Sequence, residues 1–165
     1  MHLQDIDYII DAHSNHARKE GKAYRKWDGR TPYHIHPLWC ASMIATETSL
    51  AEKIRQDGVL VLLYHDILED TALPLPDWLS GRVRQMVGEM TFQRGASQEM
   101  KEVWSRPSAI RLYKFYDKVS NLLDGCWMSD EKKKAYIEYT QALSEDVEQN
   151  YGLLNITLLA RAMLR

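Results

Sequence analysis

The 165-residue sequence has few cysteines and prolines and no long apolar run. Cys40 and Cys126 are too few for a disulfide scaffold or a zinc ribbon, so we expect a reduced, cytoplasmic setting. The five prolines and eight glycines argue against a disordered chain. The first residues, MHLQDIDYII, are charged and lack the apolar centre of a signal peptide. No stretch approaches the ~18 consecutive apolar residues of a spanning helix, so we expect no membrane association.

An excess of either charge sign is also missing. The chain carries 21 Lys and Arg against 23 Asp and Glu, a formal net charge of -2. Binding to a nucleic-acid polymer or a membrane surface depends on excess positive charge, so neither is an expected partner. With 45% hydrophobic residues, the chain is long enough for one domain with a substantial core.

Apolar residues recur at helical spacing along nearly the whole chain, and no segment alternates as a strand would. No repeat or interdomain linker interrupts the pattern. The sequence therefore predicts an all-α helical bundle in which residues 1–165 form a single domain. Helices are expected near residues 4–19, 38–47, 50–56, 58–70, 76–90, 107–123, 130–149 and 151–164, with loops at 20–36 and 91–97.

A histidine and an aspartate, His65-Asp66, close the apolar run of residues 59–64. Leaving these polar groups unpaired in a buried segment would cost several kcal/mol, on the order of 2–7 for each group. Glu69 and Asp70 follow, and in a helix they would be i,i+4 neighbours of His65 and Asp66. Four potential ligands or proton carriers on adjacent stripes are typical of a metal site.

Further candidate ligands are His36, which stands before Pro37 at a predicted helix start, and Asp117. Lys114, Asp117 and Asn121 are spaced i, i+3, i+7 and face the same way. Two imidazoles and two carboxylates suit Mn, Fe, Zn, Ni or Co better than Ca or Mg. No histidine follows His65, which favours a site with one metal ion.

The order of these motifs resembles the HD-domain metal-dependent phosphohydrolases. The resemblance is closest to the hydrolase domain of RelA/SpoT-type enzymes and to stand-alone small alarmone hydrolases of the metazoan SpoT homologue type. It covers about residues 11–158. The matching pieces are Arg25-Lys26, Thr31-Pro32-Tyr33, His36-Pro37, residues 65–71 (HDILEDT), Glu89-Met90-Thr91 and residues 114–122 (KFYDKVSNL).

The resemblance implies that His36, His65, Asp66 and Asp117 bind one divalent metal, usually Mn²⁺ in that family. Glu69 and Asp70 would then be catalytic and act on a nucleophilic water.

The same resemblance implies that Arg25 and Lys26 flank a guanine nucleotide and that Asn121 touches its ribose. Lys114, a turn before Asp117, is a further candidate for binding the sugar or a second phosphate.

Local charge agrees with a phosphorylated small-molecule substrate. Residues 18–30 hold six cationic side chains against Glu20 and Asp28, and a diphosphate is a natural partner for such a cluster. The run Lys132-Lys133-Lys134 is expected to be an exposed helix face, and His13 and His16 are not expected to be ligands. The segment of residues 92–97 departs from the acidic, lysine-containing stretch of the small hydrolases, and Arg94 is a candidate replacement for a phosphate-binding lysine.

The expected function is a Mn-dependent guanosine-3′,5′-bis(diphosphate) 3′-pyrophosphohydrolase, a hydrolase of the stringent response that acts on ppGpp. One alternative is an HD-type nucleotidase or nucleotide phosphatase that acts on a different nucleotide, such as a deoxynucleotide or a phosphorylated dinucleotide cofactor. Another is a non-catalytic nucleotide-binding HD protein. The sequence leaves the oligomeric state open.

Overall fold

The computed structural model describes residues 2–164, apart from the side chain of Glu20. In this range the regular structure is helical, and the extended pairings are the isolated bridges Ala17–Thr71 and Tyr24–Pro32. The predicted all-α fold is therefore confirmed. The α-helices are α1 (Leu3–Asn15), α2 (Ile35–Ala45), α3 (Glu52–Tyr64), α4 (Ile67–Asp70), α5 (Gly81–Met90), α6 (Ala96–Glu102), α7 (Ser108–Leu123), α8 (Asp130–Tyr151) and α9 (Asn155–Met163).

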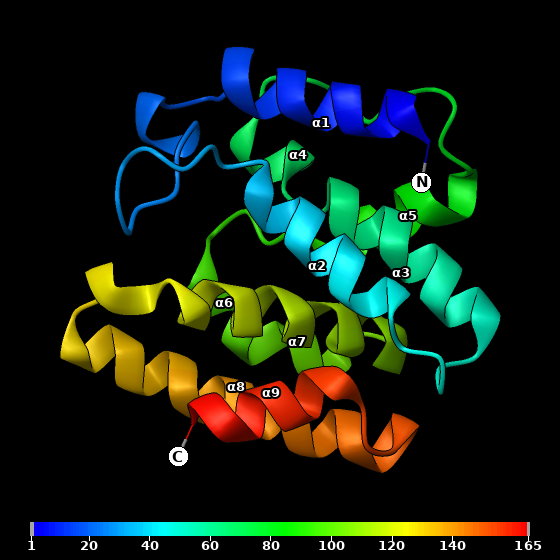
Figure 1. Cartoon of the computed structure of the whole chain (residues 1–165), viewed down its shortest axis with the longest axis vertical. Coiled ribbons are helices and arrows are strands. Elements are labelled where there is room, and N and C mark those ends of the chain that lie inside the picture. The colour runs from blue at the N-terminus through cyan, green and yellow to red at the C-terminus, as the bar shows by residue number, and fades with distance from the viewer. Residues whose placement is uncertain (1, 165) are drawn as a thin grey trace.

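Helix α7 lies at the centre of the bundle. It packs against α2, α3 and α5 on one side and against α8 and α9 on the other. Figure 1 shows α1 and α4 at one end of the molecule, α8 and α9 at the other, and α7 between them. Because both sides are covered, α7 is buried at Ile110 and at every residue from Leu112 to Ser120. The predicted helix at residues 107–123 matches this element closely.

Helix α3 corrects the predicted boundary at Gly58. The helix runs without a break through this glycine, which lies where α3 passes closest to α2 and α7. A Cβ atom there would lie 2.5 Å from Ile44 Cδ1 and 2.7 Å from Tyr113 Cε1. Gly58 is thus required for close helix packing and does not start a helix.

The predicted helix at residues 58–70 is wrong at its centre. Helix α3 ends at Tyr64, so His65 and Asp66 lie in the turn that leads into the short helix α4. The turn still keeps one helical hydrogen bond, because Asp70 N donates to Asp66 O at 2.9 Å. His65 and Asp66 both stay buried in this turn, with His65 Nε2 3.2 Å from Asp66 Oδ2.

Two other predicted boundaries differ because of tertiary pairing and capping. Helix α1 ends at Asn15 rather than near residue 19, since the next residues pair with the end of α4: Arg18 N donates to Asp70 O at 2.9 Å. Helix α5 starts at Gly81 rather than near residue 76. The Ser80 hydroxyl caps this start by accepting a hydrogen bond from Val83 N. Across residues 2–164, no helix combines the length and apolar character needed to span a bilayer.

Candidate metal centre

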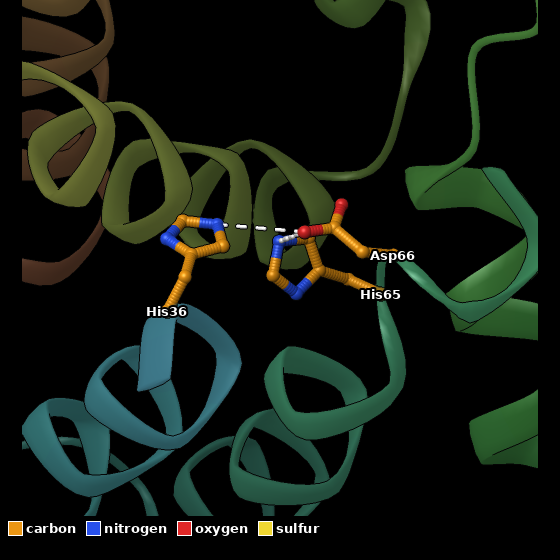
Figure 2. A group of neighbouring side chains, drawn as sticks. All are labelled: His36, His65 and Asp66. Carbon is orange, nitrogen blue, oxygen red and sulfur yellow. Dashed lines mark ion pairs between the residues drawn. The ribbon is translucent and has the colours of Figure 1, made fainter. Parts of the chain in front are cut away.

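Two imidazoles and a carboxylate converge where α2 meets the turn between α3 and α4. His36 comes from the first turn of α2, and His65 and Asp66 come from the turn after α3. Their ligand atoms all lie within 4.8 Å of one another. The Nε2 atoms of His36 and His65 lie 3.5 Å and 3.2 Å from Asp66 Oδ2. Figure 2 shows the three side chains pointing toward one another, with these ion pairs dashed. These are three of the four predicted ligands.

The far nitrogen of each imidazole is fixed by a hydrogen bond. His65 Nδ1 lies 2.7 Å from the carbonyl oxygen of Leu62, and His36 Nδ1 lies 2.8 Å from Ser120 Oγ. The two Nε2 atoms are buried and make no hydrogen bond to the described residues. A carbonyl oxygen at Nδ1 requires the proton there, which leaves the lone pair of neutral His65 on Nε2. The nitrogen and oxygen donors therefore fit a divalent transition metal.

Asp117 on α7 faces the same centre from the opposite side. Its Oδ1 atom lies 3.3 Å from His36 Nε2 and 3.8 Å from His65 Nε2, although Asp117 is not part of the 4.8 Å group. Its Oδ2 atom forms ion pairs with Lys114 at 3.3 Å and Lys118 at 3.1 Å. Asp117 thus joins the imidazole pair to two buried lysines.

Electrostatics at the centre favour a cation. Burial alone would lower the pKa of His65, but Asp66 and Asp117 outweigh it and raise the pKa to about 9. Burial would raise the pKa of Asp66, yet His65 and His36 keep it below its usual value. The buried carboxylates therefore attract positive charge, which a divalent ion would supply in place of the imidazole proton.

The predicted catalytic carboxylates lie next to this centre, in different environments. Glu69 Oε1 accepts a hydrogen bond from Phe92 N at 2.7 Å, and Asp70 Oδ1 forms an ion pair with Lys22 Nζ at 2.7 Å. Burial, together with the nearby charge of Asp66, raises the pKa of both carboxyl groups. Among the residues that the structure describes, no cationic side chain forms an ion pair with Glu69, whereas Lys22 forms one with Asp70.

A pocket of about 240 Å³ opens beside the centre, and many cationic side chains line it. The predicted substrate-binding residues line it: Arg25, Lys26, Lys114 and Asn121. Arg25 already makes hydrogen bonds within the chain. Its guanidinium donates to both Asp124 oxygens, at 2.6 Å and 2.9 Å, and to Asn121 Oδ1 at 3.0 Å. Asn121 Nδ2 in turn donates to Asp117 Oδ1 at 2.6 Å. Arg25 and Asn121 thus form a rigid wall. The charged side chains that line the pocket are Lys22, Arg25, Lys26, Asp66, Glu69, Asp70, Glu99, Lys114, Asp117, Lys118 and Lys132.

Lys26 and Lys132 lie at the mouth of this pocket. Their Nζ atoms are 4.5 Å and 4.4 Å from the ring centroid of Trp127. Lys132 was expected on a solvated face, and only its neighbours Lys133 and Lys134 are exposed in that way. Arg94, the candidate replacement for a phosphate-binding lysine, is exposed and does not line the pocket.

The sequence reasoning missed several pocket residues. Lys118 carried a usable signal, since it follows Asp117 directly and stands i+4 from Lys114. Glu99 and Lys132 had none, because α6 and α8 reach the pocket only through tertiary packing.

Comparisons with known proteins give no match to a family profile. The human guanosine-3′,5′-bis(diphosphate) 3′-pyrophosphohydrolase MESH1 is 29% identical over 126 residues, which are 70% of this chain and 68% of the human protein. The mouse protein of the same name is 27% identical over 132 residues, 74% of this chain and 68% of its own length.

A solved structure has the same fold. It is described as a metazoan ortholog of SpoT that hydrolyses ppGpp and plays a role in starvation responses. It matches 99% of this chain and 93% of its own, with a TM-score of 0.77 and 18% identity. The human and mouse relatives confirm the predicted enzyme class, a metal-dependent phosphohydrolase. The chain has the HD-domain fold of the ppGpp-hydrolase type.

Proposed function

We propose that this protein hydrolyses guanosine-3′,5′-bis(diphosphate) and releases its 3′-diphosphate as pyrophosphate. One observation carries the proposal: two buried imidazole nitrogens that make no hydrogen bond to the described residues converge on Asp66 beside a pocket lined by lysines. The nitrogens suit a metal ion, and the lysines suit a substrate with several phosphate groups. The names of the human and mouse relatives support this substrate.

The proposed metal ligands are His36, His65, Asp66 and Asp117, and the proposed metal is one Mn²⁺ ion. Borderline nitrogen and hard oxygen donors together favour such an ion over Ca²⁺. When bound, the metal supplies Lewis-acid chemistry that acidifies a water and withdraws charge from phosphoryl oxygens. Tyr33 supports the arrangement, since its hydroxyl donates to Asp66 Oδ2 at 2.8 Å and fixes that carboxylate.

Glu69 and Asp70 are proposed to have different roles toward the attacking water. Glu69 has a raised pKa and no direct cation, so it is suited to accept the proton of the attacking water. Asp70, held by Lys22, is suited to orient that water. The water oxygen bonds to the phosphorus attached to the ribose 3′ oxygen, and that P–O bond breaks. The proton taken by Glu69 ends on the released 3′ hydroxyl.

Substrate contacts are proposed for Arg25, Lys26, Lys114 and Asn121. The paired guanidinium of Arg25 lies 5.2 Å from the Tyr33 ring centroid and forms a flat wall for a base. The exposed ammonium of Lys26 at the pocket mouth can reach a phosphate distant from the metal. Lys114 and Asn121 both contact Asp117 and so lie where the reacting group must sit.

The proposal is tested by a product assay with manganese-loaded protein and guanosine-3′,5′-bis(diphosphate). We expect pyrophosphate and a guanosine 5′-diphosphate, and no product from Asp66→Ala. Orthophosphate as the product, or turnover only of other nucleotides, would assign the protein to the nucleotidase class instead. Absence of turnover on every nucleotide by a metal-loaded, folded protein would contradict an enzymatic role.

A further inference from the structure

A glutamate from α6 lies between two lysines inside the pocket. Glu99 Oε2 lies 3.2 Å from Lys114 Nζ, and Glu99 Oε1 lies 2.9 Å from Lys118 Nζ. All three residues are almost fully buried, with 5%, 3% and 4% of their surfaces exposed. All three also line the pocket beside Asp66 and Asp117. The carboxylate thus fills a position that faces the substrate pocket.

Lys114 and Lys118 are placed so that both could bind the same anion. They stand one turn apart on α7 and point to the same side. Aromatic rings flank them, with Phe92 5.3 Å from Lys114 Nζ and Tyr136 5.4 Å from Lys118 Nζ. Such walls exclude water and strengthen the attraction of each ammonium for an oxygen anion.

Both lysines also contact Asp117, whose Oδ2 atom lies 3.3 Å from Lys114 Nζ and 3.1 Å from Lys118 Nζ. Asp117 also faces the candidate metal centre, so the two lysines lie directly beside that centre. A phosphoryl group bound at the centre would therefore lie within reach of the same two ammonium groups that Glu99 now neutralises.

We propose that Lys114 and Lys118 form a phosphoryl-binding subsite, and that Glu99 is its resident counter-ion, displaced when substrate phosphate enters. The inference rests on the proposed function for the identity of the pocket. A carboxylate offers two oxygens with one negative charge, while a phosphoryl group offers three with more charge. The incoming group therefore competes with Glu99 for the same donors. Glu99 keeps two buried cations paired until that exchange.

Binding of inorganic phosphate tests this competition without catalysis. Isothermal titration calorimetry would use the full chain with one equivalent of manganese, comparing wild type with Glu99→Gln. Removing the internal competitor should tighten phosphate binding by about tenfold or more, since hydrogen bonds between charged groups are stronger than those between neutral ones. Glu102→Gln is the matched control, because Glu102 lies on the same helix and is exposed, with its carboxylate bonded to Gln98. It should bind as wild type does.

Equal or weaker phosphate binding by Glu99→Gln would overturn the inference and make Glu99 a permanent structural partner of the lysines. An equal gain in Glu102→Gln would overturn it too, since only the loss of a surface charge would then be at work. If Glu99→Gln does not fold, Glu99→Asp withdraws the carboxylate by one methylene and should show a smaller gain of the same sign.

Thermal unfolding gives a second readout that does not depend on turnover. Added phosphate should raise the Tm of Glu99→Gln by more than that of wild type, because at the same concentration a ligand that binds more tightly stabilises the folded state more. A phosphate-induced rise no larger than in wild type would contradict the exchange. Failure of the nucleotide product assay leaves this result intact, so the two proposals can fail separately.

Discussion

Two buried polar clusters lie next to each other along α7, and they are built in opposite ways. Tyr116 belongs to one, where its hydroxyl donates to Glu47 Oε1 at 3.0 Å. Glu47 also accepts from the backbone nitrogens of Asn155 and Ile156, both at 3.0 Å. Asp117, the next residue, belongs to the other cluster, where His36 Nε2 and His65 Nε2 lack hydrogen-bond partners among residues 2–164.

The contrast separates buried polar groups that stabilise the fold from buried polar groups that are available to bind a ligand. Glu47, two residues after the end of α2, accepts hydrogen bonds from α7 and from the first turn of α9, so its carboxylate is satisfied within the chain. The imidazole nitrogens instead face the carboxylates of Asp66 and Asp117 without forming a hydrogen bond, an arrangement that suits a cation bound between them. Mutations in the first cluster should therefore change stability, and mutations in the second should change chemistry.

The largest expected effect on stability is at Glu47. Glu47→Ala removes the acceptor of the buried Tyr116 hydroxyl, the buried Ile156 nitrogen and the part-buried Asn155 nitrogen, and should lower the free energy of unfolding by about 3 kcal/mol or more. The activity per folded molecule should not change, because Glu47 does not line the pocket. Urea unfolding measures the loss, with the exposed Glu52→Ala as control. A loss of turnover without a loss of stability would erase the distinction between the clusters.

Glu69 offers the converse test. Glu69→Gln keeps the shape and the contact with Phe92 N but cannot accept a proton, so kcat should fall by about 100-fold, or about 2.7 kcal/mol. Metal content and stability should stay near those of wild type. Single-turnover kinetics on manganese-loaded protein provide the measurement. Wild-type turnover by the variant would show that another group takes the proton.

His13 on α1 gives the smallest expected effect and concerns pH. Its ring is fully buried against Tyr33, 4.9 Å between centroids, and burial lowers its pKa to about 4 from 6.5. In the unfolded chain His13 binds a proton as the pH falls below 6.5, whereas in the folded protein it does so only near pH 4. The free energy of unfolding therefore decreases as the pH falls from 6.5 toward 4. Between pH 7.5 and 5 the loss should be about 2 kcal/mol.

Denaturant unfolding of His13→Phe at both pH values measures this term. The variant should lose about 2 kcal/mol less than wild type over the same interval. The exposed His16→Gln is the matched control on the same segment. An unchanged pH dependence in His13→Phe would mean that the His13 ring is protonated or solvated in the folded protein.

The sequence predicted elements whose signal is local. Apolar spacing placed α7 within a residue of its observed start and at its observed end, since Pro107 marks the entry. The HDILED string predicted a cluster at His65 and Asp66, and the structure places these two residues within 4.8 Å of a ligand atom of His36. The break after Tyr64 was missed, because helical periodicity continues through residues that tertiary contacts turn out of the helix.

Residues that reach the pocket from other elements could not be predicted. Glu99 and Lys132 have no spacing relation to His65 or Asp117, and only the packing of α6 and α8 on α7 brings them near. Arg25 was predicted as a substrate contact, but its pairing with Asp124, about a hundred residues away in sequence, was not visible. Long-range ion pairs leave no periodic trace in the chain.

Metal content tests the central claim most directly, because that claim assigns the imidazole nitrogens to a metal ion. Wild type and Glu47→Ala, loaded with manganese and passed through gel filtration, should each retain about one ion per folded chain. His65→Ala and Asp117→Ala should retain none. A wild-type protein that holds no metal would contradict the account, and stoichiometric metal in Asp117→Ala would contradict the four-ligand site.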